Sequence, residues 1–215
     1  MSEIWPLFDI CIEIADISLK PVDDKAAFAL GELATKGIHE PKLMPFSTPW
    51  SDLESPELEK SVLQNIWKNR ASFDKQSWRL DFAVFKDDCP IGIQDIKGDE
   101  FNIRRSVSTG SWIGKEFQGQ GIGTNARRAI LDFAFFGLKA NEAHSDAYED
   151  NHASIRVSKK LGYERNGTQT WARRNKPAKS LDWILTRDKW EQSNHERAKI
   201  IGLDKCLNWF GTESD

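Results

Sequence analysis

A glycine-rich segment near the middle of the chain carries the residues most suited to chemistry. It consists of Gln118, Gly119, Gln120, Gly121, Ile122, Gly123 and Thr124. A strand-like stretch ends just before it, and a helix-like stretch over residues 125–138 follows it. Glycines at such a junction leave backbone N–H groups open to a phosphate, and the helix N-terminus adds about half a positive charge facing that anion. The segment therefore predicts a pyrophosphate cradle.

Two familiar phosphate loops do not match this segment. A Walker loop needs Lys-Ser/Thr after its last glycine, whereas Thr124 directly follows Gly123. The dinucleotide fingerprint G-x-G-x-x-G has a different glycine spacing. The pattern that remains is Gln-x-x-Gly-x-Gly, formed by Gln118, Gly121 and Gly123. Taken alone, it is also compatible with an ordinary turn before a helix.

A second block lies at residues 151–163. Asn151 suits the N-cap of a short helix, and Gly162 suits the position after its last turn. An ordinary capped helix explains this block by itself. Two such blocks in this order, about thirty residues apart with one strand between them, are much harder to obtain by chance.

Composition limits the classes of protein to consider. A chain of 215 residues with 39% hydrophobic and 29% charged residues suits one globular domain. A net charge of −3 and no Lys/Arg run argue against a nucleic-acid partner. No apolar run is long enough for a membrane span, and the N-terminus has no signal-peptide pattern. Cys11, Cys89 and Cys206 match no zinc spacing, so we expect no metal and a cytoplasmic setting.

Hydrophobic periodicity predicts an α/β fold with a mixed, mostly antiparallel sheet flanked by helices. The expected strands are 7–19, 78–86, 91–96, 107–113, 143–148, 163–172 and 181–185. The expected helices are 24–33, 55–71 with Ser55 as its cap, 122–138, 151–161 and an amphipathic C-terminal helix within 190–210. That last helix could pack on its own domain or form a subunit contact in a homodimer. A proline-dense loop over 37–50 separates the first two helices.

The chain from Leu7 to Trp190 resembles the GNAT superfamily of N-acetyltransferases. The loop at Gln118, the Asn151 block and the element order carry this resemblance. The proline-dense loop favours the branch that includes ribosomal-protein N-terminal and small-molecule acetyltransferases. The resemblance implies an acyltransferase domain over 1–190 with a splayed central strand pair, and a C-terminal helical extension over 191–215 packed on it.

The resemblance also implies a co-substrate, acetyl-CoA or another acyl-CoA, with no metal. By position, Trp112 and Ile113 would offer main-chain groups to the pantetheine arm, which Asn151 and Ser154 would face from the short helix. The backbone amides of residues 118–124 would hold the diphosphate. Arg127 and Arg128 could reach the 3′-phosphate, although we interpret both as solvated helix charges.

The implied chemistry is direct attack of an amine on a thioester. An alkyl amine with a pKa near 10 is neutral in only about one molecule per thousand at pH 7, so a base must act. The departing thiolate benefits from an acid, and many family members have a Tyr where this chain has Ser158. A surface serine is the alternative interpretation. The base stays open among four carboxylates, each of which could simply be solvated: Asp95, Glu100, Asp146 and Glu149.

The acceptor is expected beneath the loop that carries His39, Phe46 and Trp50. It would be a small-molecule amine or a protein N-terminus. Arg173 and Arg174 could meet an anionic acceptor or acyl group, so succinyl transfer stays open, although a solvated hairpin is favoured. A non-catalytic acyl-CoA-binding module and an ATP-binding protein are the rival functions. The Ser158 slot favours the first rival, and the missing Walker lysine argues against the second.

Overall fold

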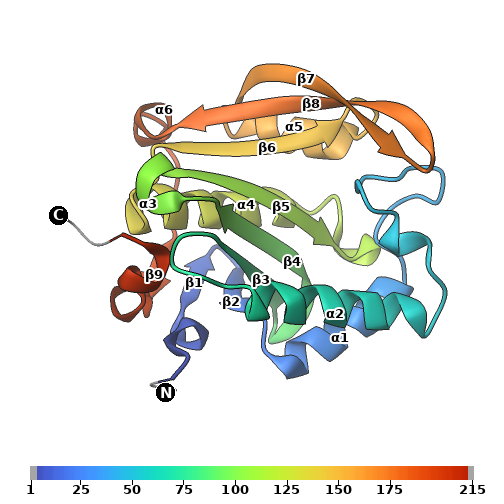
Figure 1. The fold of residues 1–215 in the computed structure, drawn as a ribbon, viewed down its shortest axis with the longest axis horizontal. Helices are drawn as coiled ribbons and strands as arrows, with labels where there is room; N and C mark the ends of the chain where they lie inside the picture. Colours follow the sequence, from blue (N-terminus) through green and yellow to red (C-terminus); the bar gives the residue numbers. More distant parts are fainter. Residues whose placement is uncertain (1–3, 213–215) are drawn as a thin grey trace.

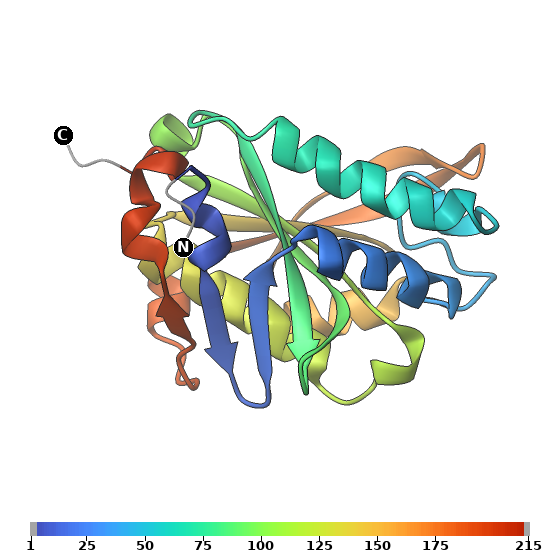
Figure 2. The same ribbon diagram turned by 90° about the horizontal axis from the view of Figure 1, so that it is seen from below.

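The computed structural model describes residues 4–212, and within this range a nine-stranded sheet has the order β7-β8-β6-β5-β4-β3-β2-β1-β9. Figures 1 and 2 show helices on both faces of this twisted sheet. The strands are β1 Cys11–Ile14, β2 Ile17–Pro21, β3 Trp78–Lys86, β4 Cys89–Gly98, β5 Ser106–Ile113, β6 Glu142–Tyr148, β7 Glu164–Arg173, β8 Lys176–Thr186 and β9 Lys199–Ile201.

The α-helices divide between the two faces. They are α1 Asp24–Thr35, α2 Glu57–Ala71, α3 Phe101–Arg104, α4 Ile122–Asp132, α5 His152–Lys160 and α6 Arg187–Glu191. One turn of π-helix, η4 Phe133–Gly137, extends α4. Every strand pair is antiparallel except β5 with β6. The predicted α/β class with a mostly antiparallel sheet is therefore confirmed.

Alternation along the central strands creates a core on each face. Phe82 of β3 and Ile96 of β4 pack with Ile130 of α4 in one cluster. Ala83, next to Phe82, and Ile93, three residues before Ile96, pack in the other cluster, with α1 and α2. Because successive strand side chains point to opposite faces, the two cores require both faces to be covered. No helix among residues 4–212 is long and apolar enough to cross a membrane.

The central strand pair is splayed, as the family resemblance implied. The parallel pairing of β5 with β6 runs only from Ser106↔Glu142 to Ser108↔His144. On its other side, β5 remains paired with β4 as far as Ile113. Beyond Ser108, the two strands therefore separate, and the edge of β5 that faces β6 has no strand partner.

The first predicted strand was wrong in its extent. Residues 7–19 form the end of a 3-10 helix, η1 Pro6–Asp9, and then a β1–β2 hairpin. Ile14 and Ile17 are both buried, which breaks the alternation of a single strand, and Ala15 takes a φ of 50° at the turn between them. Ser55 was also wrongly assigned as the cap, because α2 begins at Glu57 after Pro56 and has no side-chain cap.

The prediction of a C-terminal α-helix was also wrong. The segment forms β9, which pairs with β1 through Cys11↔Ile201, and then two 3-10 turns, η5 Leu203–Lys205 and η6 Leu207–Phe210. Gly202, at the turn after β9, has a φ of +78°, and a Cβ there would lie 2.2 Å from the Asp9 carbonyl oxygen, so this turn requires glycine. Apolar residues at steps of three and four suit these turns as well as an α-helix.

The C-terminal segment is nevertheless packed on the domain. The carboxylate of Asp132 at the end of α4 accepts hydrogen bonds from the Trp190 indole at 2.9 Å and the Ala198 backbone amide at 2.7 Å. The division at residue 190 stays a prediction, and the outer ends of its two ranges, 1–3 and 213–215, lie outside the described residues.

Candidate functional site

The glycine loop between β5 and α4 leaves open space in front of its backbone. Gly119 and Gly121 have φ angles of +76° and +84°, a region that favours glycine, and a side chain at either would meet nothing within 4 Å. Gly123 has no such backbone requirement, and its Cβ would meet only Ile113, at 4.0 Å. The absence of a side chain at Gly123 therefore fits the close approach of a ligand better than a need of the fold.

Backbone amides at this loop are free to bind that ligand. Within the described part of the chain, the N–H groups of residues 119–123 donate to no protein acceptor, and α4 has no side-chain cap. Five consecutive free amides thus lie at a helix N-terminus, and free amides at such a position can bind phosphate groups. The loop thus fits the diphosphate of CoA.

The two ends of the predicted cradle are used by the fold. The Gln118 amide donates to Lys115 and the Thr124 amide to Gly121. The side chain of Gln118 donates to the carbonyl oxygens of Ile38 and Ile113, both at 2.7 Å. Gln118 therefore ties the loop to the end of β5 and to the segment after α1, and residues 119–123 supply the free donors.

Helix α5 packs beneath the splayed strands. Asn151 caps it, because its side-chain oxygen accepts the Ser154 amide at 3.2 Å. Ser158 is fully buried, so the surface interpretation of this residue is wrong. Its hydroxyl has no hydrogen-bond partner among the described residues. A buried orphan hydroxyl is uncommon, and a ligand atom in the gap would satisfy it. Pantetheine contacts by Trp112, Ile113, Asn151 and Ser154 stay predictions.

Arg127 is buried, with 4% of its surface exposed, so its interpretation as a solvated charge is wrong. Its guanidinium donates to the hydroxyl oxygens of Ser145 on β6, at 3.0 Å, and Ser111 on β5, at 3.4 Å. Both serines lie past the last paired residues, so Arg127 bridges the strands where their ladder has ended. The sequence held one signal of this burial: Arg127 precedes the apolar Ile130 by three residues, which places both on the same face of the helix. Arg128, half-buried, donates to Asn125.

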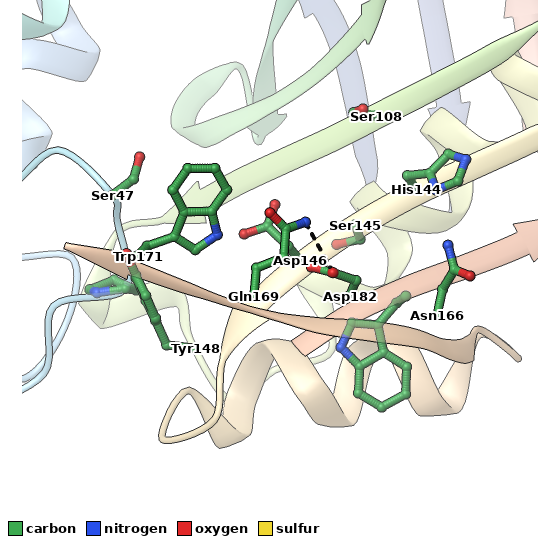
Figure 3. Close-up of a pocket in the computed structure, with 12 residues that line it drawn as sticks. Ser47, Ser108, His144, Ser145, Asp146, Tyr148, Asn166, Gln169, Trp171 and Asp182 are labelled. Carbon is green, nitrogen blue, oxygen red and sulfur yellow. Dashed lines mark hydrogen bonds between the residues drawn. The ribbon is translucent and has the colours of Figure 1, made fainter. Parts of the chain in front are cut away.

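A cavity of about 480 Å³ lies on the α1–α2 face, between the β5–β6 strands and the β7–β8 hairpin. Figure 3 shows polar and aromatic side chains around it. Its lining includes Pro45, Ser47, Ser108, His144, Asp146, Tyr148, Trp171 and Asp182. Because Ser108 and His144 are the last paired residues of β5 and β6, the cavity adjoins the point where the strands separate.

Asp146 is the predicted base that reaches this cavity. The Asp146 side chain is accessible from the cavity, and its partial burial by the cavity walls raises its pKa. The nearby Asp182 raises the pKa further, and a hydrogen bond from Ser180 and the charge of Arg127 oppose the shift. Asp95 is buried in an ion pair with Arg79 at 2.8 Å, and exposed Glu100 and Glu149 do not line the cavity.

Three predicted acceptor residues form a row of rings. The ring centres of His39 and Phe46 are 5.9 Å apart, those of Phe46 and Trp50 5.1 Å, and those of Trp50 and Trp112 6.0 Å. His39 also hydrogen-bonds Ser51 at 2.7 Å. None of His39, Phe46 and Trp50 lines the cavity, although Pro45 and Ser47 of the same loop do. Acceptor binding by the three rings stays a prediction.

The arginine pair of the β7–β8 hairpin is engaged rather than free. Arg173 contacts both carboxylate oxygens of Asp150 at 2.8 Å and covers the Tyr148 ring. Arg174 pairs with Asp52 of the α1–α2 loop. Arg174, together with a hydrogen bond from Arg173 to the Met44 carbonyl oxygen at 3.3 Å, therefore ties the hairpin to that loop. The hairpin itself is solvent-exposed, as expected, but its arginines are engaged in ion pairs. Sequence reasoning missed this contact because Arg174 and Asp52 are 122 residues apart.

A splayed β5–β6 pair, a free-amide glycine loop and an adjoining cavity together define an acyl-CoA-binding enzyme fold. The family model for the acetyltransferase (GNAT) domain matches residues 17–164. The chain therefore belongs to the GNAT family, whose members are CoA-dependent N-acetyltransferases. Among residues 4–212, no group of three or more His, Cys, Asp and Glu side chains is placed to hold a metal ion.

Known proteins resemble the chain in sequence and in fold. YdaF of Bacillus subtilis (strain 168), provisionally named a ribosomal N-acetyltransferase, is 35% identical over 65 residues, which are 30% of this chain and 36% of YdaF. The aligned segment thus spans about a third of that relative. RimJ of Mycobacterium smegmatis, solved with a CoA disulfide, has a TM-score of 0.71 at 18% identity, covering 94% of this chain and 95% of RimJ.

A further solved structure has the same fold. RimL, a ribosomal L7/L12 alpha-N-protein acetyltransferase solved in complex with coenzyme A, matches with a TM-score of 0.66 at 19% identity. The match covers 83% of this chain and 99% of RimL. At this identity the likeness to RimL and RimJ concerns the fold.

Proposed function

We propose that this protein transfers an acetyl group from acetyl-CoA to a primary amine bound in the cavity. The observation that carries the proposal is that the glycine loop and the cavity both adjoin the same splayed strand pair. The free-amide loop follows the unpaired end of β5, and the cavity begins where β5 and β6 part. Acetyl-CoA lying along the gap would bring its thioester to the cavity.

Binding of acetyl-CoA uses main-chain groups in this proposal. The amides of residues 119–123 hold the diphosphate, and Gly123 leaves room for it. The unpaired edge of β5 at Trp112 and Ile113 accepts the pantetheine arm in place of a strand. Asn151 and Ser154 border the arm from the start of α5.

Transfer requires two proton movements. The acceptor arrives as an ammonium ion, and Asp146 takes its proton, so that the neutral amine attacks the thioester carbonyl carbon. The C–S bond then breaks, and the Ser158 hydroxyl, which has no other partner, donates a hydrogen bond to the departing thiolate. Serine is a weak acid, so its contribution is stabilisation of the thiolate. The second proton, which the nitrogen loses as the amide forms, ends on the CoA thiol, and Asp146 returns the first to solvent.

The structure favours acetyl over succinyl as the acyl group. A succinyl carboxylate would need a cation near the cavity, whereas Arg173 and Arg174 are held by Asp150 and Asp52. Asp146 and Asp182 would repel such a carboxylate. The names of YdaF and RimL support a protein N-terminus as one acceptor, and a small-molecule amine is the other. The free thiols of Cys11, Cys89 and Cys206 support the proposed cytoplasmic setting.

Release of free CoA thiol over a panel of amines tests the proposal. We expect release that depends on both acetyl-CoA and an amine, and an acetylated amine detected by mass spectrometry. Binding of acetyl-CoA without release for any amine or N-terminal peptide would instead identify a non-catalytic acyl-CoA-binding module. Binding of ATP in place of acetyl-CoA would refute both.

A further inference from the structure

We propose that Asp146 and Asp182 select the acceptor by charge, favouring an amine that carries a second cationic group and rejecting one that carries a carboxylate. This inference rests on the proposed acetyl transfer and names the substrate class of that same cavity. It assigns Asp182 a role in specificity that is separate from the proton transfer at Asp146.

The two carboxylates face each other directly. Asp146 of β6 and Asp182 of β8 are register partners in adjacent antiparallel strands, so their side chains project from the same face of the sheet. Both line the cavity (Figure 3). Like charges at directly opposed strand positions destabilise a sheet. A cationic group of a ligand placed between them would offset the repulsion.

Neutral donors alone satisfy these carboxylates. Gln169 donates to Asp182 at 3.0 Å, and Ser180 donates to Asp146 at 3.3 Å. Within the described residues, neither carboxylate forms an ion pair with Lys, Arg or His. Arg127 lies below the sheet and lowers the pKa of Asp146 from there, but its own hydrogen bonds go to uncharged oxygens. The two carboxylates therefore meet the cavity with no cationic side chain bonded to either of them.

The other walls suit a cation as well. Trp171 is 49% exposed at the cavity, and an indole face attracts ammonium groups. Tyr148 lines the cavity too, and its buried hydroxyl has no hydrogen-bond partner among the described residues, so it is available to a polar ligand. No Lys or Arg side chain belongs to the lining. The lining histidine, His144, contacts Glu142, and Arg173 above the Tyr148 ring is paired with Asp150, so both nearby basic groups already have acidic partners.

Three amines of similar length test the inference. 1,4-Diaminobutane is a dication, butylamine a monocation and 4-aminobutanoate a zwitterion, so they differ mainly in the group distal to the reacting amine. For the wild-type protein we expect kcat/KM to fall in that order, by about tenfold between the first and the last, because unfavourable charge juxtaposition is costly in a confined site. Equal values for the diamine and the zwitterion would overturn the inference.

The Asp182→Asn variant isolates the charge. It keeps the shape of the side chain and the contact with Gln169, and we expect the ratio between diamine and zwitterion to fall to about threefold or less. Asp99→Asn is the matched control, since Asp99 lies in the turn after β4, pairs with Lys97 and lines no cavity, and it should keep the wild-type ratio. An unchanged ratio in Asp182→Asn would contradict the assignment.

Failure of the proposed function can be told apart from failure of this inference. If acetyl-CoA binds but no amine releases CoA, calorimetric binding of the same three amines replaces kinetics as the readout. Tighter binding of the diamine that Asp182→Asn removes would then support the charge selection. Equal binding of the three compounds, or diamine binding that survives in a folded Asp182→Asn protein, would overturn it.

Discussion

The two ends of the β5–β6 gap are built in different ways. The CoA end is one continuous stretch of backbone, residues 119–123, whose amides are free because glycines leave them bare. The acceptor end is made of side chains from the α1–α2 loop and from β5, β6, β7 and β8. A site made of backbone depends on local conformation, whereas a site made of side chains depends on the register of distant strands.

Charge separates the two ends as well. The loop presents N–H donors and the N-terminus of α4, which suit an anion. The cavity presents Asp146 and Asp182, which suit a cation. We therefore expect substitutions at the two ends to affect different substrates, and the following changes test that division.

The largest effect is expected for Gly123→Glu at the CoA end. The added side chain would occupy open space, and Gly123 has an ordinary backbone conformation, so the fold should survive. Its charge would repel the diphosphate, and we expect acetyl-CoA affinity to fall by more than about a hundredfold. Calorimetry and a melting curve measure the two quantities. Gln64→Glu on the exposed face of α2 adds the same charge and should bind normally.

Asp146→Asn should act at the other end. The amide cannot accept the ammonium proton, so kcat should fall about a hundredfold while acetyl-CoA affinity stays near the wild-type value. In the wild type, activity should be lost as the pH falls through the Asp146 pKa, which lies above that of an ordinary aspartate because of enclosure and Asp182. An acidic limb that persists unchanged in Asp146→Asn would assign the base elsewhere.

Ser158→Ala tests the junction between the two ends. Because the buried hydroxyl has no protein partner, its removal should not destabilise the fold. A hydrogen bond made to the thiolate only as the C–S bond breaks should appear in kcat rather than in affinity, at about ten- to a hundredfold with the lower value expected. Ser61→Ala on α2, outside the cavity lining, is the control. Wild-type turnover would show that the thiolate leaves without Ser158.

The smallest effect is expected for Arg174→Gln. This change releases an exposed ion pair with Asp52 that helps to hold the α1–α2 loop to the β7–β8 hairpin. We expect the acceptor KM to rise about two- to threefold, with no change in acetyl-CoA affinity, and high salt to reproduce the effect in the wild type. Lys60→Gln breaks a comparable exposed pair on α2 and should change neither value.

The same division explains what the sequence could reveal. The glycine loop and the Asn151 cap follow from local patterns whose meaning does not depend on distant residues, whereas the splay was implied by the family resemblance. The Asp146–Asp182 pair depends on the register of β6 with β8, and the Arg174–Asp52 contact joins segments far apart, so neither has a local signal. The C-terminal segment was mistaken for one α-helix because apolar residues in short 3-10 turns have the same spacing as in an α-helix.

Titration of the protein with acetyl-CoA, and separately with ATP, tests the central claim most directly. That claim is that the free amides of residues 119–123 hold the diphosphate of an acyl-CoA. We predict saturable heat and a raised melting temperature with acetyl-CoA, equivalent to about 2.7 kcal/mol of stabilisation at a hundredfold excess over Kd. ATP should give neither, and Gly123→Glu should abolish both signals. Tight ATP binding with no response to acetyl-CoA would contradict the account.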